Sequence, residues 1–226
     1  MTPFRWALAA ANVLAWPGLV LGLGGDGGWI EGWVFAAWFV GFCTFTIGWL
    51  ARKDPGLLAE RYRAPGTGGQ SDADLVITFA IGFGFIAWIV LLGLDGRRRQ
   101  WTPRLPLGAE LLGGAMLAGA AFFMFRAFAD NTFASPLARI QEERGHRVVS
   151  TGVYGTVRHP MYLGAILMFA GAALLCNSLA ALAAAAALAA VLIVRIRDEE
   201  ALLVAKLEGY DDYRRRVRWR LVPHVW

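Results

Sequence analysis

Charged residues and potential metal ligands are scarce in this sequence. Only 17% of the 226 residues are charged, whereas a soluble domain usually carries about a quarter. The two cysteines, Cys43 and Cys176, lie far apart inside apolar runs, which excludes a disulfide framework and a cysteine zinc site. The three histidines, His146, His159 and His224, lack metal-ligand spacing, so no metal centre is predicted.

The sequence also gives no support for a soluble nucleotide-binding fold. Gly22, Gly24 and Gly27 satisfy G-x-G-x-x-G, but that fingerprint requires a strand before it and a helix after it, and here it falls in a short turn between apolar runs. The net charge of +5 and the pI of about 9.7 would suit nucleic acid. The basic residues instead flank apolar runs, as in membrane proteins, so no nucleic-acid partner is predicted.

Long apolar runs are abundant. Hydrophobic residues make up 57% of the chain, and its mean hydropathy is +0.48. Runs of about 20 such residues cross a bilayer. We predict spans at Phe4–Leu23, Trp29–Leu50, Leu75–Leu94 and Leu107–Phe128, a polar stretch at Ala129–Pro160, a hairpin of Met161–Leu175 and Leu179–Val194, and an amphipathic surface segment at Arg195–Trp226.

The predicted fold is therefore an all-α polytopic membrane bundle. It has about five to six spans plus a C-terminal amphipathic surface helix. Residues 1–128 form a four-span membrane region, and residues 129–226 form a second region with the hairpin and the surface helix. The first apolar run is long and no small-residue cleavage site stands out, so no cleavable signal is expected.

Lysine and arginine in short loops predict the orientation. With the N-terminus inside, the loop Gly24–Gly28 lies outside and has no basic residue, while the polar stretch Ala129–Pro160 and the C-terminal segment lie inside. One loop disagrees, because it would place four arginines outside: Arg97, Arg98, Arg99 and Arg104.

The stretch GHRVVSTGVYGTVRHPMYLG, Gly145–Gly164, combines polar side chains with the start of an apolar run. Pro160 suits the first turn of a helix, and the N–H groups at a helix start favour a bound anion. Arg158 adds a permanent charge that can hold a carboxylate in a fork. Ionisable residues at such a membrane boundary are candidates for function.

A second polar group follows the last apolar run. Glu199 and Glu200 lie next to Arg195 and Arg197 in RIRDEE. Two acids at this position either bind an ammonium group or pair with the arginines. Spacing alone leaves both interpretations open.

Taken together, the two stretches resemble a known superfamily. RHPMYLG, an apolar hairpin, Arg-x-x-x-Glu-Glu, GYDDY and the ending RLVPHVW are similar to the isoprenylcysteine carboxyl methyltransferase and phospholipid methyltransferase superfamily. The resemblance covers roughly Asn131–Trp226. It implies a helical membrane methyltransferase that binds S-adenosylmethionine without a Rossmann sheet, at the cytosolic face, with a lipophilic acceptor arriving from the bilayer.

The resemblance also implies roles for residues at the matching positions. Arg158 and Arg195 match arginines near the reacting centre. The residues that match the cofactor motif, the acidic pair and the preceding His and Tyr are His146, Tyr154, His159, Pro160, Tyr162, Gly164, Glu199 and Glu200. The cofactor chemistry agrees, because an acid can take its ammonium, an arginine its carboxylate, and a tyrosine its adenine or sulfonium.

The acceptor stays open in the sequence. A carboxylate acceptor needs no base, whereas an amine or thiol needs its proton removed, with His159 or a glutamate as the candidate base. We expect a lipid or lipophilic small molecule as substrate, no obligate protein partner, and a bacterial inner-membrane location with the active site facing the cytoplasm. The alternatives are an NADPH-dependent sterol-type reductase, which Met161 and the glutamate pair disfavour, and a non-catalytic transporter subunit.

Overall fold

The computed structural model describes residues 3–226, with side chains from residue 6 onward, and within that range it is all helical with connecting turns. The long helices are α1 (Pro3–Gly24), α2 (Ile30–Lys53), α4 (Asp72–Gly93), α5 (Leu107–Asp130), α6 (Pro160–Leu175) and α7 (Leu179–Lys206). Short elements connect or follow them: α3 (Pro55–Arg61), the π-helix η1 (Leu94–Arg99), the 3-10 turns η2 (Glu142–Arg144) and η3 (Gly152–Gly155), and α8 (Tyr210–Arg216). The predicted all-α membrane bundle is confirmed.

Five helices are long and apolar enough to cross a membrane, and the sixth is shorter. The five are α1, α2, α4 with η1, α5 and α7. Helix α6 has 16 residues, which gives a length of about 24 Å, less than the roughly 30 Å hydrocarbon core. The hairpin predicted from the sequence therefore has one leg that is too short to span.

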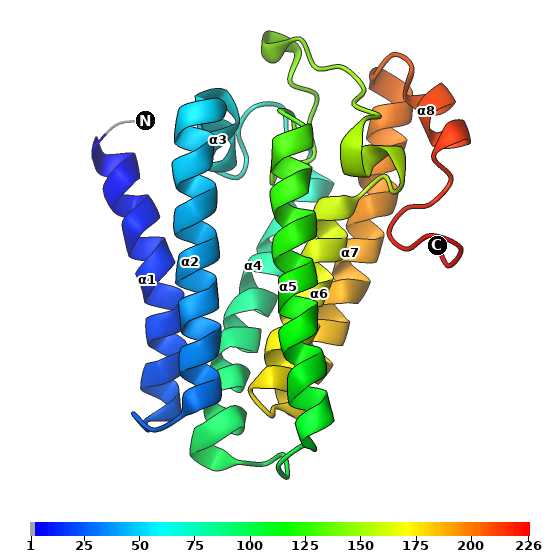
Figure 1. The fold of residues 1–226 in the computed structure, drawn as a ribbon. Helices are drawn as coiled ribbons and strands as arrows, with labels where there is room; N and C mark the ends of the chain where they lie inside the picture. The colour runs from blue at the N-terminus through cyan, green and yellow to red at the C-terminus, as the bar shows by residue number, and fades with distance from the viewer. Residues whose placement is uncertain (1–2) are drawn as a thin grey trace.

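The helices run alternately up and down, so that the loops gather at two ends (Figure 1). The upper end carries α3, the residue 131–159 segment and α8, and the lower end carries the turns between α1 and α2, α4 and α5, and α6 and α7. Helices α5 and α6 lie side by side along their length. The polar groups singled out in the sequence thus share one end of the bundle.

Helix starts follow the local sequence. Ser71 caps α4 by accepting a hydrogen bond from the Asp74 N–H, and Ser178 caps α7 by accepting one from Ala181, which satisfies N–H groups that the helix itself cannot. Pro160 occupies the first turn of α6, where its missing N–H costs nothing.

Small residues let α5 and α6 pack closely. A Cβ atom built at Gly164 would lie 2.5 Å from Met124 Cγ, and one built at Gly113 would lie 2.5 Å from the carbonyl oxygen of Gly171. Only glycine permits this approach without displacing a helix. Such small-residue contacts are typical of helices that associate in lipid.

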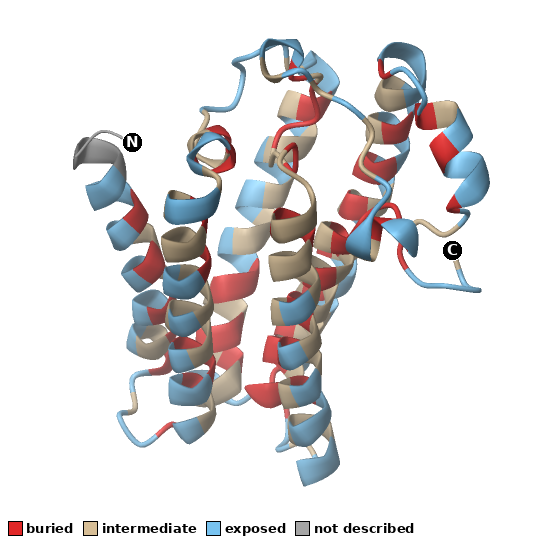
Figure 2. Cartoon of the chain, turned by 45° about the horizontal axis from the view of Figure 1, so that its top comes forward, coloured by how far each residue is buried: buried red, intermediate tan, exposed pale blue. Residues whose placement is uncertain are grey.

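Figure 2 shows exposed residues along the outside of the helices, and many large apolar residues are among the exposed ones. Exposed aromatic residues on the spans include Trp33, Phe45, Phe79, Phe83 and Phe122. A soluble monomer rarely presents such large apolar areas to water. This surface agrees with a protein whose helices face lipid.

Two of the four arginines at the lower end are paired with acids. Arg97 forms an ion pair with Asp26, and Arg104 Nη2 lies 3.1 Å from Glu31 Oε1. These arginines disagreed with the orientation prediction. Their acidic partners at the same end reduce the net positive charge there.

The C-terminal surface helix is present but shorter than the segment predicted for it. Residues from Arg195 to Lys206 continue α7, and α8 covers only Tyr210–Arg216. The remaining residues fold back through turns, with Arg158 N–H donating to the Trp219 carbonyl at 2.9 Å and His159 N–H to Arg220 at 2.9 Å. The polar end of α7 therefore rises above the apolar part of the bundle.

Candidate functional site

A cavity lies at the upper end of the bundle. The start of α6, the end of α7, the residue 131–159 segment and α8 build its walls. The lining comprises Asn131, Phe133, Ala134, Ser135, Leu137, Arg139, His146, Arg147, Val148, Val149, Tyr154, Arg158, His159, Met161, Tyr162, Glu199, Leu202, Leu203, Leu207, Tyr210 and Tyr213.

Glu199 is the one acidic side chain among the described residues of the lining. The Tyr162 hydroxyl donates to Glu199 Oε2 at 2.6 Å, a short charge-assisted bond. The Tyr162 ring stacks on His159 with centroids 5.6 Å apart. A carboxylate is thus held in a fixed position beside two rings at the start of α6.

Glu200 faces a different set of partners. Its Oε1 accepts from Arg158 Nε at 2.6 Å and lies 3.2 Å from His159 Nε2, and its Oε2 accepts from Arg220 Nε at 2.8 Å. Arg158 Nη1 also donates to the carbonyls of Val217 and Arg218. Glu200 therefore ties α7, the start of α6 and the C-terminal segment together behind the cavity.

Aromatic rings form the remaining wall. His146 stacks on Phe133 with centroids 4.6 Å apart, and the Tyr213 hydroxyl donates to the Tyr154 carbonyl at 2.8 Å. Burial raises the pKa of Tyr154, Tyr210 and Tyr213 above the usual range, so these hydroxyls stay neutral. The wall can stack on a flat ring and face a cation.

Histidine 146 is neutral in this setting. Burial, together with the charges of Arg139 and Arg144, lowers its pKa from 6.5 to about 4. The backbone N–H of Gln141 donates to Nδ1 at 3.3 Å, which requires an unprotonated nitrogen. The ring is available for stacking at neutral pH.

Glycine at position 152 follows from the packing of the loop. Its φ is +59°, and a Cβ atom there would lie 2.0 Å from Asp130 Oδ2. The same carboxylate accepts from the Val153 N–H at 2.9 Å. The turn that carries Tyr154 is thereby fixed against the end of α5.

Arg195 lies below the cavity, and no part of it belongs to the lining. It is 5% exposed and forms an ion pair with Asp74 of α4 at 3.0 Å, while Nη2 donates to the Pro136 carbonyl at 2.6 Å. Its Nε is buried without a hydrogen-bond partner in the described structure. A buried donor without a partner is uncommon.

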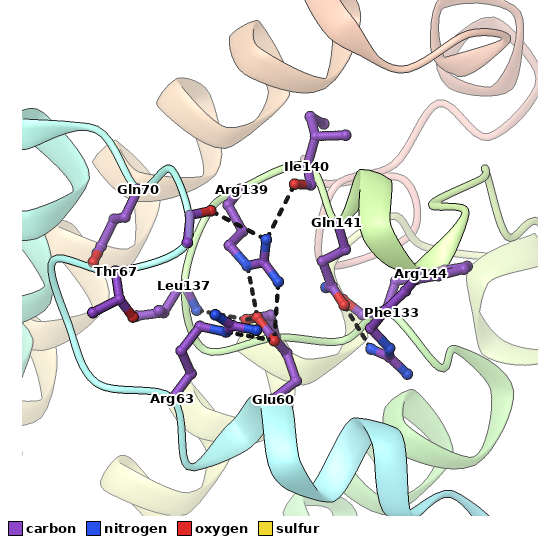
Figure 3. A network of polar contacts seen from close by, with 12 residues as sticks. Glu60, Arg63, Thr67, Gln70, Phe133, Leu137, Arg139, Ile140, Gln141 and Arg144 are labelled. Atoms are coloured by element: carbon purple, nitrogen blue, oxygen red, sulfur yellow. Dashed lines mark hydrogen bonds and ion pairs between the residues drawn. The ribbon is translucent and has the colours of Figure 1, made fainter.

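A polar network connects the cavity wall to α3 (Figure 3). Arg139 donates to both Glu60 oxygens, through Nε at 2.8 Å and Nη2 at 3.0 Å, and to the Gly68 carbonyl at 3.1 Å. It also pairs with Glu143. Burial raises the pKa of Glu60, but Arg139 and Arg63 outweigh this and leave it below the usual value.

The structure brings most of the predicted site residues together. His146, Tyr154, Arg158, His159, Tyr162 and Glu199 line the cavity, whereas Pro160, Gly164, Arg195 and Glu200 support it from behind or below. Asn131, at the start of the stretch that carries the resemblance, also lies in the lining. The sequence did not identify Phe133, Arg139, Tyr210 or Tyr213 as site residues. For the three aromatic residues, the recurrence of rings in this region was the only signal.

Fold and site together define a helical membrane protein with a polar and aromatic cavity at one end of the bundle. Residues 115–205 match the model of the isoprenylcysteine carboxyl methyltransferase (ICMT) family. The match begins within α5 and ends within α7, so it contains the α6–α7 hairpin and most of the cavity lining. This segment is therefore similar to that family, whose members are methyltransferases by name.

Proposed function

We propose that this protein transfers a methyl group from S-adenosylmethionine to a lipophilic acceptor at the cytosolic face of the membrane, with the cavity as the cofactor site. The observation that carries the proposal is Glu199, a carboxylate fixed by Tyr162 in an aromatic cavity at a helix start. These groups of the cavity match a molecule that has an ammonium group, a carboxylate and a flat base.

Each part of the cofactor has a counterpart in the cavity. Glu199 accepts from the ammonium group. Arg158 lines the cavity and keeps Nη2 without a partner among the described residues, so it can donate to the carboxylate together with N–H groups at the start of α6. The rings of Phe133, His146 and Tyr154 offer faces for adenine.

When bound, S-adenosylmethionine supplies a methyl group on a positively charged sulfonium. The protein's part is to position the two reactants, which accounts for most of such a catalysis. The Tyr162 ring and the Glu199 carboxylate provide negative potential for the sulfonium. For an acceptor that carries a proton, His159 held by Glu200 is the candidate base. Arg195 lies outside the lining, its Nε is sealed and it pairs with Asp74, so its part is to hold α7 against α4 below the cavity.

The proposal also assigns a separate role to each of the two regions of the chain. Residues 129–226 bind the cofactor, and residues 1–128 supply four spans that shape the approach from the bilayer. Two buried ion pairs join these parts, Arg139 with Glu60 and Arg195 with Asp74.

Isothermal titration of the detergent-purified protein with S-adenosylmethionine, and with NADPH in parallel, tests the proposal. We expect micromolar binding of S-adenosylmethionine only. Glu199→Gln removes the charge-assisted bond, which is worth about 1.5–3 kcal/mol, so affinity should fall by about tenfold or more.

Asp198→Asn is the matched control, because Asp198 precedes Glu199 on α7 but is exposed and lies outside the cavity. Its affinity should equal that of the wild type. Binding of NADPH without binding of S-adenosylmethionine would replace the methyltransferase proposal with a reductase.

A further inference from the structure

Arg61, the last residue of α3, lies between helices near the cavity. Its guanidinium stands over the Phe128 ring at 4.0 Å, and Nη1 donates to the Ala134 carbonyl at 3.2 Å and lies 3.5 Å from Met161 Sδ. These three partners come from α5, the residue 131–159 segment and α6. None of them carries a charge.

The lack of a counter-charge distinguishes Arg61 from the other arginines that are not exposed. Each of the others whose side chain the structure describes has a carboxylate within ion-pair distance: Arg63, Arg97, Arg126, Arg139, Arg144, Arg158, Arg195 and Arg220. A cation withdrawn from water without an anion is costly. Contacts with a ring and a carbonyl recover only part of that cost.

Two donors of Arg61 remain available. Nε and Nη2 make no hydrogen bond to any residue that the structure describes, and they are not among its sealed unpartnered atoms, which are Thr46 Oγ1 and Arg195 Nε. Burial lowers the pKa of Arg61 to about 10, so the side chain is still a cation at neutral pH. The free pair has the fork geometry that matches a carboxylate or a phosphate.

Arg61 lies between an apolar cluster and the cavity. Leu50, Leu58, Phe128 and Ala134 form a buried cluster with Met161 packed against it. Ala134 and Met161 also line the cofactor cavity. A ligand at Arg61 would thus meet an anion partner, apolar side chains and the edge of the cavity together.

We propose that Arg61 binds an anionic group, a carboxylate or a phosphate, of the lipophilic acceptor and so selects acceptors by charge. The apolar part of the acceptor lies against the cluster around Phe128, and its reacting end faces the cavity past Met161. This inference rests on the proposed methyl transfer for the identity of the ligand as acceptor. The anion site itself follows from the contacts of Arg61.

Binding of three probes to the protein in phosphatidylcholine nanodiscs tests the site without any turnover. Oleate carries a carboxylate, oleoyl lysophosphatidate a phosphate, and oleamide the same chain without charge. The wild type should bind at least one of the anions about tenfold more tightly than oleamide. In Arg61→Gln this preference should shrink to within about twofold, and in Arg61→Lys, which keeps the charge but not the fork, it should be intermediate.

Arg52→Gln is the control, because Arg52 is exposed and donates only to the carbonyl of its own helix. It should keep the full preference. A melting temperature in detergent close to that of the wild type verifies that each variant is folded, and Arg61→Lys still reports on the site where Arg61→Gln does not fold.

Equal binding of charged and neutral probes by the wild type, or a preference that survives in Arg61→Gln, would overturn the inference. The result also separates the two proposals. An anion preference that depends on Arg61 in a protein that fails to bind S-adenosylmethionine would leave the site standing and remove the methyl transfer. Cofactor binding without the anion preference would leave the methyl transfer standing and remove the anion site at Arg61.

Discussion

Glu199 and Glu200 are adjacent in the sequence but have different surroundings in the structure. Successive residues of a helix point about 100° apart, so two neighbouring acids on α7 cannot both face one cavity. Glu199 lines the cavity and accepts from Tyr162, while Glu200 binds Arg158, His159 and Arg220. The helical period could have predicted that only one acid faces the cavity, but not which one.

The same limit applies to the two arginines that the sequence suggested near the reacting centre. Arg158 lines the cavity although most of its donors bind Glu200 and the C-terminal segment. Arg195 pairs with Asp74, a residue 121 positions earlier in the chain. A pairing at this distance depends on how α4 packs against α7, which the local sequence does not specify. Arg61 went unnoticed for the same reason.

The protonation of the single residue His146 predicts how the stability of the protein depends on pH. Its pKa is about 4 in the folded protein, mainly because burial disfavours the charged form, whereas an unfolded histidine has a pKa of about 6.5. Between these values the unfolded chain binds more protons, so stability is full above pH 6.5 and falls as the pH drops toward 4.

Thermal unfolding of wild type and His146→Asn at pH 7.5 and pH 5 measures this contribution. Scaled down for the partial exposure of the ring, it amounts to on the order of 1 kcal/mol at pH 5, or a melting temperature lower by about 2–4 °C. His146→Asn should lose less stability on acidification, whereas His224→Gln, at an exposed position, should follow the wild type. An equal loss of melting temperature on acidification in His146→Asn and wild type would contradict the assignment of a neutral, half-buried His146.

At the scale of helices, hydropathy located every long element. All four N-terminal runs and the second leg of the hairpin correspond to observed spans. The ends were harder to place, because α7 continues to Lys206 through RIRDEEALLVAK. That segment is polar and was expected on the membrane surface. Packing of its inner face against the cavity and the C-terminal residues stabilises it as a helix that rises away from the bilayer.

A hydrogen-bond network of Asp95 links helices at the lower end. The Asp95 carboxylate is 1% exposed and accepts from the Thr102 N–H at 2.8 Å, the Thr102 hydroxyl at 2.6 Å, the Ser178 hydroxyl at 2.8 Å and the Ala180 N–H at 3.1 Å. It thereby joins η1, the turn before α5 and the start of α7. Nothing in the sequence near Asp95 indicated partners so far along the chain.

Asp95→Ala should destabilise the protein strongly. The substitution leaves several donors unsatisfied in a buried site, at a cost of about 2–4 kcal/mol. Thermal unfolding in detergent should show a melting temperature lower by about 5–15 °C. Asp212→Ala, at an exposed position of α8, should change it by no more than about 1–2 °C. A variant of Asp95 as stable as wild type would mean that these hydrogen bonds contribute little.

For the whole molecule, the charges at the two ends bear on its orientation. The lower end has four arginines in Arg97–Arg104, but Arg97 pairs with Asp26 and Arg104 lies near Glu31 and Glu110. The upper end carries the basic run of α8, Arg214–Arg216, beside the cavity. The positive-inside tendency counts basic residues near the ends of spans and is not a rule about net charge. Both ends carry such residues, and we propose the upper end as cytosolic because more of them lie there.

This orientation predicts which positions a membrane-impermeant maleimide reaches in intact bacterial cells. Arg98→Cys, at an exposed lower-end position without an ion pair in the described structure, should be labelled from outside. Arg216→Cys, exposed on α8, should be labelled only after the membrane is permeabilised. The native Cys176 is buried and Cys43 is half-buried on a span, so the unmutated protein serves as the background.

The reverse labelling pattern would place the cavity on the outer face. A cofactor made in the cytoplasm could not reach it there, so the proposed methyl transfer would then fail for the whole molecule even if S-adenosylmethionine bound to the purified protein. Labelling of Arg98→Cys alone in intact cells would instead put the Glu199 cavity where the cofactor is present, and would leave the acceptor at Arg61 to arrive from the bilayer.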